Sequence, residues 1–246
     1  MLLLVRPGER WPVLAGANRD ERLDRRFLKP GRHWPDAPRV IAGKDVEGGG
    51  SWFGVNDDGV FATIVNGMDR LGPLPGKTSR GALVLRALRE RSARDAARSL
   101  GATPPDRHRG FTLIVADREA AFALASDERT VTITELQPGH HLVTPDGCDV
   151  ASSPRFAEHF PAFTAAAVPD PERGDWRAWE DLLRHVDEDD PHRAMTVVTP
   201  HDFGTVCSGL VAVPQDAATP PRMRFSNGPP TRAPYEPVGE TCVSEA

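Results

Sequence analysis

Four polar residues in a row, Asn18-Arg19-Asp20-Glu21, directly follow the apolar run at residues 13–17. They offer an amide, a cation and two carboxylates, groups that can bind a charged small molecule or move protons. Because the apolar run predicts a buried strand, we expect the four residues at the end of that strand, facing a shared cleft. A charged tetrapeptide on its own is more simply a solvated corner, so its interpretation depends on the rest of the chain.

Other candidate sites have weaker patterns. Residues 72–78 resemble a phosphate-binding loop, but only three residues separate the glycines and two of these are prolines, which have no N–H to donate. The histidines include the pair His140-His141 and the scattered His192 and His201, none with metal-binding spacing, so surface or hydrogen-bonded imidazoles are expected and no metal site is predicted. A histidine that ligates haem needs no such spacing.

No nucleophile stands out either. Ser152-Ser153 and Cys207-Ser208 lie outside any Gly-x-Ser-x-Gly turn. Cys148 follows a glycine and is predicted to be a turn residue, because nothing local would lower its pKa. We therefore assign no catalytic residue from the sequence.

Composition narrows the class of protein. The chain has 246 residues, 39% of them hydrophobic, and a net charge of -5, which predicts one globular domain and argues against nucleic-acid binding through a basic surface. Its three cysteines form no Cys-x-x-Cys pair, so a reduced, cytoplasmic setting is expected. The apolar opening at residues 1–5 is too short for a signal peptide or a membrane span and predicts a buried strand.

Strands and turns are predicted to dominate the first half. A hairpin is expected from residues 2–5 and 11–17, followed by strands at 39–42, 51–55 and 60–65. The amphipathic stretch 79–100 predicts one long helix, with Ser79 as N-cap, Glu90 paired with Arg94, and Gly101 just beyond its end. Further strands are expected at residues 111–116, 121–125, 130–136 and 141–144.

The second half adds helices and returns to strands. Helices are predicted at residues 155–163 and 176–186, with Asp175 as the N-cap of the second and an acidic loop after it. Strands are expected at 210–213 and 223–225. A single domain would span residues 1–228, and the proline-rich tail 229–246 would lie extended on the surface. This order suits an α+β fold with two mainly antiparallel sheets packed face to face and helices on the outer faces.

Six motifs in order resemble the NRDE family, the family of the transport and Golgi organization protein. The match is strong over the first half of the chain and loose over the rest, and an ordered set is more specific than any single motif. The motifs are Ala17-Asn18-Arg19-Asp20-Glu21; Trp34 ahead of Ile41-Ala42-Gly43-Lys44-Asp45; Gly49-Gly50-Ser51-Trp52-Phe53-Gly54; Ala62-Thr63-Ile64-Val65-Asn66; Ser79-Arg80-Gly81; and Gly110-Phe111 with Leu113-Ile114-Val115-Ala116-Asp117.

The resemblance implies a four-layer αββα fold of the N-terminal-nucleophile-hydrolase type. Enzymes with this fold cleave amides with the first residue of a strand, and family members typically carry a cysteine after the initiator methionine. Here that position is Leu2, which we expect to face the polar motif across the first hairpin. Val206 stands where the family tends to have an arginine. We therefore predict a protein without hydrolytic activity. An internal cut exposing Ser51, Cys148 or Thr205 would restore a nucleophile, but on the wrong strand.

The predicted function is to bind a small molecule, or to hand it on, in a cleft formed by Asn18, Arg19, Asp20, Glu21, Trp52 and Asn66. Arg19 would face an anionic group of the ligand, with Asp20 as its orienting partner. The resemblance implies a link with haem trafficking, so haem or a related metabolite is the first ligand to test. Two alternatives stay open: an amide hydrolase, which needs a free nucleophilic amino terminus, and a structural or interaction protein.

Overall fold

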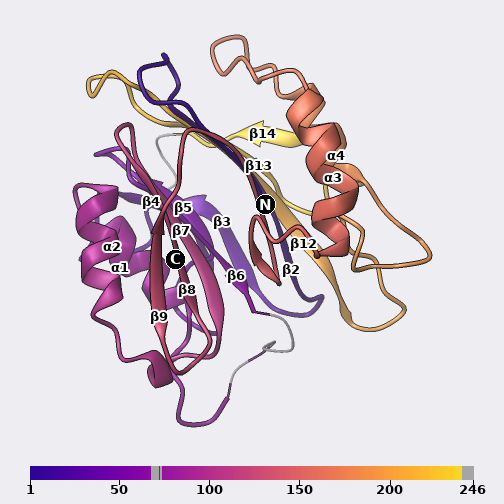
Figure 1. Cartoon of the computed structure of the whole chain (residues 1–246), viewed down its shortest axis with the longest axis horizontal. Coiled ribbons are helices and arrows are strands. Elements are labelled where there is room, and N and C mark those ends of the chain that lie inside the picture. The colour runs from indigo at the N-terminus through magenta and orange to yellow at the C-terminus, as the bar shows by residue number, and fades with distance from the viewer. Residues whose placement is uncertain (68–71, 73, 240–246) are drawn as a thin grey trace.

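The computed structural model describes residues 1–67, 72 and 74–239. Two seven-stranded antiparallel sheets pack face to face, with helices on both outer sides (Figure 1). This arrangement confirms the predicted α+β sandwich. In chain order the elements are β1 (Leu2–Val5), β2 (Val13–Arg22), β3 (Phe27–Gly31), β4 (Val40–Asp45), β5 (Phe53–Asn56), β6 (Phe61–Asn66), α1 (Gly81–Leu88), α2 (Ala93–Gly101), the 3-10 helix η1 (Pro105–Arg107), β7 (Phe111–Ala116), β8 (Ala121–Ser126), β9 (Val131–Glu135), β10 (Gly139–Thr144), β11 (Gly147–Cys148), α3 (Pro154–Ala165), α4 (Arg177–Arg184), β12 (Phe203–Val213), β13 (Arg222–Ser226) and β14 (Tyr235–Pro237).

Strand order in the two sheets is simple. The first sheet runs β11-β10-β1-β2-β12-β13-β14, and the second runs β3-β4-β5-β6-β7-β8-β9. The predicted hairpin of β1 and β2 is present, with Leu3 opposite Ala15. The second sheet is a meander in which each strand pairs with the next strand along the chain, so most of its register follows from local turns.

The strand β2 is longer than predicted, and this changes the position of the polar motif. β2 continues to Arg22 because β12 pairs with it from Val13 to Arg22, with one register shift between Thr205 and Cys207. The expectation that Asn18-Arg19-Asp20-Glu21 follows the end of a strand is therefore wrong. These residues lie inside β2, where their side chains must alternate between the two faces of the sheet.

Three apolar layers hold the fold together. One lies between the second sheet and α1 and α2, a second between the two sheets, and a third between the first sheet and α3 and α4. Trp179 and Phe163 are fully buried in the third layer, where their rings meet edge to face at 5.1 Å. Burying a side chain of this size contributes about 1.5–3 kcal/mol. The layers fix both sheets relative to the helices.

The segment at 79–100 forms two helices, so the prediction of one long helix is wrong. The Asn56 side chain ends α1, because its Nδ2 donates to the carbonyls of Leu88 at 2.8 Å and of Glu90 at 2.7 Å. Ser92 begins α2, since its Oγ accepts a hydrogen bond from the Asp95 N–H. These two side chains satisfy backbone groups that a continuous helix would have paired internally.

Two local predictions for this segment also fail. Arg80, not Ser79, is the N-cap of α1, although the Ser79 Oγ accepts from the Gly81 N–H at 3.3 Å. Arg94 bonds Glu135 on the neighbouring strand β9 at 3.0 Å and not Glu90, because Glu90 lies in the break between the helices. Gly101 is the last residue of α2.

The second pair of helices is confirmed with small shifts at its ends. Trp176 is the N-cap of α4, and Asp175 lies one residue earlier, where its Oδ1 accepts from the Arg177 N–H at 3.3 Å. The proline-rich tail is predicted to lie extended on the surface, and Tyr235–Pro237 is an extended strand with Glu236 and Pro237 exposed. This strand, β14, also pairs with the edge of the first sheet, and Tyr235 is buried. The domain boundary at residue 228 stays a prediction. No helix among the described residues is long and apolar enough to cross a membrane.

Candidate functional site

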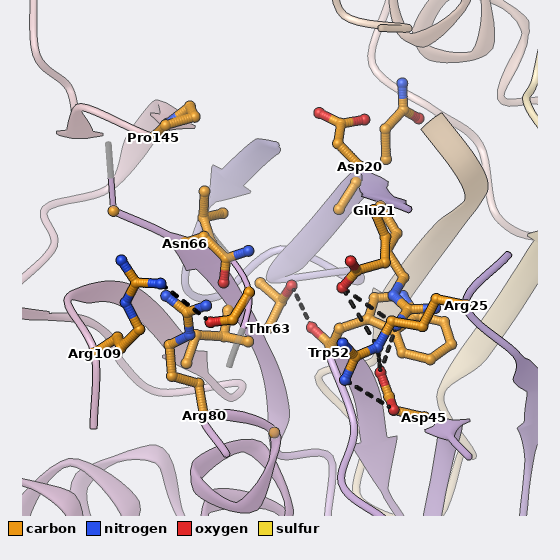
Figure 2. Close-up of a pocket in the computed structure, with 18 of the residues that line it drawn as sticks. Asp20, Glu21, Arg25, Asp45, Trp52, Thr63, Asn66, Arg80, Arg109 and Pro145 are labelled. Atoms are coloured by element: carbon orange, nitrogen blue, oxygen red, sulfur yellow. Dashed lines mark hydrogen bonds and ion pairs between the residues drawn. The ribbon is translucent and has the colours of Figure 1, made fainter. Parts of the chain in front are cut away.

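A cavity of about 860 Å³ opens beside the second half of β2 and the end of β6. Segment 74–81 and the loops after β10 and α4 complete its walls. Figure 2 shows acidic and basic side chains around Trp52 on one side, Arg80 and Arg109 on the other, and Thr63 between them. All six residues of the predicted cleft are part of the lining: Asn18, Arg19, Asp20, Glu21, Trp52 and Asn66.

The alternation of β2 divides the motif into two pairs. Asn18 points toward the helices, where its Nδ2 donates to the carbonyls of Leu183 at 2.9 Å and Met195 at 2.8 Å. Asp20 lies on the same side and accepts a hydrogen bond from the Thr205 hydroxyl at 2.6 Å. Arg19 and Glu21 project from the opposite face of the strand. Asn18 thereby fastens β2 to the segment that follows α4.

Arg19 is held in a nearly buried network. Its guanidinium stacks on Trp52, with Cζ 4.2 Å from the ring centroid, and its Nη2 donates to the Asp45 carboxylate at 2.6 Å. The side chain is only 7% exposed, and Nη1 has no hydrogen-bond partner among the described residues. The expected partnership of Arg19 with Asp20 is therefore wrong, because Asp45 fills that role. Gly43 leaves the space that the Trp52 ring occupies.

Asp45 is the centre of this network. Its carboxylate accepts from Arg25 at 2.8 Å and from the Gly48 N–H at 2.7 Å, in addition to Arg19. Burial alone would raise the pKa of Asp45, but the hydrogen bonds from Arg25 and Gly48 and the nearby charges lower it below its usual value. Asp45 is therefore ionised and fixed between the two arginines next to the cavity, and the Glu21 carboxylate, 3.5 Å from Arg25, supplies a second negative charge.

Asp20 faces a different cation. Arg155, near the start of α3, places its Nη1 3.9 Å from Asp20 and donates through Nη2 to the Pro191 carbonyl. Val206, where the family tends to have an arginine, is buried and absent from the lining. Arg155 therefore brings a cation to the cavity from another element.

The first residue of the chain borders the cavity, and the second does not. Met1 lies in the lining and its α-amine donates to the Val143 carbonyl at 2.8 Å. Burial, with repulsion from Arg155, lowers the pKa of this amine to about 5. Leu2 is fully buried in the layer under α3 and α4. The expectation that Leu2 faces the polar motif is therefore wrong.

Arg80 and Arg109 lie side by side on the other wall (Figure 2). Arg80 donates to the Gly110 carbonyl at 3.0 Å, and burial together with the charge of Arg109 lowers the pKa of Arg80 to about 10. The two neighbouring guanidinium groups favour an anion at this wall, while the charges of Glu21 and Glu128 act on Arg80 in the opposite direction. Gly50 and Gly81 set the position of Arg80, since a Cβ on Gly50 would lie 2.4 Å from the Gly81 backbone.

The remaining lining is mixed. The Asn66 side chain forms no hydrogen bond with any other described residue, so its amide is available to a ligand. The apolar part of the wall includes Ala17, Ile64, Val65, Val143, Met195, Val197 and Phe203. His192 is the histidine of the lining, and it is exposed. The cavity can thus accommodate an apolar body with an anionic end.

Sequence reasoning missed the basic residues of the lining. Lys77, Arg80, Arg109 and Arg155 were not predicted as site residues, although Arg80 belongs to one of the six motifs. Lys77 comes from the segment that resembles a phosphate loop, and it pairs with Glu128 at 2.8 Å. These four basic residues follow no local sequence pattern. Only the motif around Arg80 could have indicated from the sequence that one of them lies at the site.

Two facing antiparallel sheets with helices on both outer sides form an αββα sandwich like that of the N-terminal-nucleophile hydrolases. A penicillin V acylase from Agrobacterium tumefaciens matches with a TM-score of 0.56 and 12% identity, over 92% of this chain and 83% of that chain. A variant of the conjugated bile acid hydrolase from Clostridium perfringens matches over 57% of this chain and 52% of that one, with 11% identity and a TM-score of 0.39. The first match supports the fold, and the second adds no argument.

The chain belongs to the Transport and Golgi organisation 2 family, whose model matches residues 1–216. This confirms the family resemblance that the ordered motifs indicate. No curated protein sequence matches the chain.

Proposed function

We propose that this protein binds a small amphipathic molecule with an anionic group, without hydrolysing it, and holds it in the cavity at the Asn18-Arg19-Asp20-Glu21 motif. The adjacent guanidinium groups of Arg80 and Arg109 are the observation that supports this proposal. Arginine suits a carboxylate, because its planar group can donate two parallel hydrogen bonds. Arg19 is only 7% exposed, whereas Arg80 and Arg109 are partly exposed, so in this proposal Arg19 supports the wall while Arg80 and Arg109 meet the anion.

Haem is the first ligand to test. Its propionates would pair with Arg80 and Arg109, its ring would contact the apolar wall, and the imidazole of His192 lies within the same lining. A related anionic metabolite of similar shape would use the same contacts. The six residues predicted from the sequence are proposed to shape this cavity, with Asn66 as a direct polar contact.

A spectroscopic titration tests the binding. We expect a Soret shift when haem is added, and a loss of about tenfold to 100-fold in affinity for Arg80→Gln and for Arg109→Gln, because each removes one charged hydrogen bond. Arg94→Gln is the matched control, since Arg94 bonds Glu135 away from the cavity. Absence of a Soret shift would rule out haem as the ligand. Equal affinity of the wild type and all three variants would contradict the proposed anion site.

The alternative function is amide hydrolysis. It is favoured by the fold shared with a penicillin V acylase and by the position of Met1 at the cavity. Such a reaction requires a nucleophile at the first residue, and methionine has none. We expect an intact mass that includes Met1 and no turnover of penicillin V. A processed chain with a nucleophilic first residue, or measurable turnover, would favour the hydrolase.

A further inference from the structure

Three potential metal ligands meet on the hairpin of β10 and β11. The ligand atoms of His141, Cys148 and Asp149 all lie within 4.8 Å of one another. Among the residues that the structure describes, no other group of three histidine, cysteine or acidic side chains comes together in this way. None of the three lines the cavity, so the hairpin cluster is separate from the proposed ligand site.

His141 is already oriented as a ligand. Its Nε2 lies 2.7 Å from the Gln137 carbonyl and must donate to it, which directs Nδ1 toward the Asp149 carboxylate at 2.6 Å. Histidines that bind metals almost always donate their other N–H to a carbonyl or carboxylate in this manner. The ring is therefore fixed in the orientation that a metal requires, with Nδ1 as the coordinating atom.

Asp149 is held by its side chain and by its backbone. Its Oδ1 accepts from the Leu142 N–H at 2.9 Å, and its own N–H donates to the Leu142 carbonyl at 3.0 Å. Its φ of 56° lies in the left-handed region, which few residues other than glycine adopt. This backbone conformation brings the carboxylate next to Cys148 and His141. The hairpin thus adopts an uncommon backbone conformation at Asp149, and this conformation brings the three side chains together.

The donor set selects the metal. Thiolate, imidazole and carboxylate together suit zinc and similar divalent transition metals, whereas magnesium and calcium prefer oxygen alone. We propose that His141, Cys148 and Asp149 bind one divalent transition-metal ion of the zinc class. Tetrahedral zinc, with bonds of about 2.0–2.3 Å, places its ligand atoms about 3.3–3.8 Å apart. His141 Nδ1 and the Asp149 carboxylate, now 2.6 Å apart, would separate, and any pair near the 4.8 Å limit would approach, so shifts of about 1 Å would form the site.

Binding is electrically balanced. The metal replaces the Cys148 thiol proton and the proton on His141 Nδ1, and both protons go to solvent. The thiolate and the Asp149 carboxylate then balance the double charge of the ion. Three protein ligands leave one position for water. Asp149 is exposed, which gives the ion a route in, and the bound metal fixes the hairpin that carries Val143 and Pro145 to the cavity edge.

The test uses the purified full chain with Zn²⁺ and with Co²⁺. We expect one ion per chain, a thiolate-to-cobalt charge-transfer band, and at least about 100-fold weaker binding for Cys148→Ser and for His141→Gln. His140→Gln is the matched control, because His140 packs against Phe163 and should bind as the wild type does. Equal zinc affinity in all variants, or cobalt binding without the thiolate band, overturns the proposal.

A second measurement uses only the wild-type protein, so it does not depend on whether a variant folds. Alkylation of the wild type is followed by peptide mass spectrometry with and without Zn²⁺. Metal binding should slow modification of Cys148 at least tenfold, and an unchanged rate overturns the site. Because Arg80 and Arg109 take no part, haem titration and zinc titration can fail independently.

Discussion

At the scale of single residues, the motif that identifies the family is largely structural. Asn18 bonds backbone carbonyls and Arg19 is stacked and paired, so both hold the cavity wall in place. In the proposed function the anion is bound by Arg80 and Arg109, which line the cavity from other parts of the chain. Sequence reasoning found the residues of the cavity through the motif, but it paired Arg19 with Asp20 when its partner is Asp45, because stacking and burial depend on tertiary neighbours.

Asp45 gives a test of the buried network. Asp45→Ala leaves Arg19 without its carboxylate, and we expect the free energy of unfolding to fall by about 3 kcal/mol near neutral pH. The folded-state pKa of Asp45 is lowered, so its contribution is present above the unfolded value of about 3.9 and disappears as the pH falls through the folded value. Urea unfolding at several pH values should therefore show a difference between the two proteins that shrinks in acid.

Asp24→Ala is the control for this series. Asp24 is exposed and pairs with Arg22 at the surface, a contact of about 0–1 kcal/mol. A constant difference between wild type and the Asp45 variant across the acidic range would show that the carboxylate charge is not what stabilises the network.

At the scale of elements, local patterns predicted strands well and long-range pairing poorly. Apolar runs located β1, β7 and β8, because each is buried along its length. They did not reveal the polar half of β2, since its pairing comes from β12 at the other end of the chain. The break between α1 and α2 was missed for the same reason: Asn56, which ends α1, lies on β5.

The helix break can be tested at Asn56. Asn56→Ala leaves the carbonyls of Leu88 and Glu90 and the N–H of Val60 without their partner, and we expect a loss of about 2–3 kcal/mol in chemical unfolding. Asn66→Ala is matched in residue type, and it should change stability by less than about 0.5 kcal/mol because its side chain has no bond to a described residue. Equal losses would contradict the capping role.

The contact of Gly50 with Gly81 is a second test at this scale. A Cβ on Gly50 would meet the Gly81 backbone at 2.4 Å, so Gly50→Ala must move the start of α1 and with it Arg80. We expect a loss of about 2–3 kcal/mol and weaker ligand binding. Gly239→Ala, which meets nothing within 4 Å, should change neither quantity. Unchanged melting of the Gly50 variant would show that the two backbones are free to separate.

At the scale of the whole molecule, the sequence predicts the fold more completely than it predicts the residues of the cavity. The order of strands and helices predicted four layers because each sheet must cover one face with helices and the other with its partner sheet. The shape and lining of the cavity depend on the positions of a few bulky and charged side chains in the folded protein. Composition and periodicity do not specify these positions. The predicted cleft residues all line it, whereas the basic wall could not be derived from spacing.

Ligand binding should stabilise the whole molecule. A ligand present at about 100 times its dissociation constant adds about 2.7 kcal/mol, which corresponds to a rise of about 5 to 10 °C in Tm for a chain of this size. Thermal melts with haem and other anionic amphiphiles measure this, with the Arg80→Gln, Arg109→Gln double variant as control. If no ligand raises the Tm of the wild type, a structural or interaction role is favoured.

The buried α-amine of Met1 restricts where a purification tag can be attached. Residues added before Met1 would begin at a nitrogen that donates to the Val143 carbonyl, and they would run along the cavity wall before reaching solvent. A peptide there would occupy part of the cavity, and the Met1 nitrogen, now an amide, would lose its charge and keep a single N–H for the Val143 carbonyl. Glu236 and Pro237 are exposed at the sheet edge and do not line the cavity, so a handle at the other end of the chain leaves the Met1 nitrogen undisturbed. Binding experiments should use protein tagged at that end.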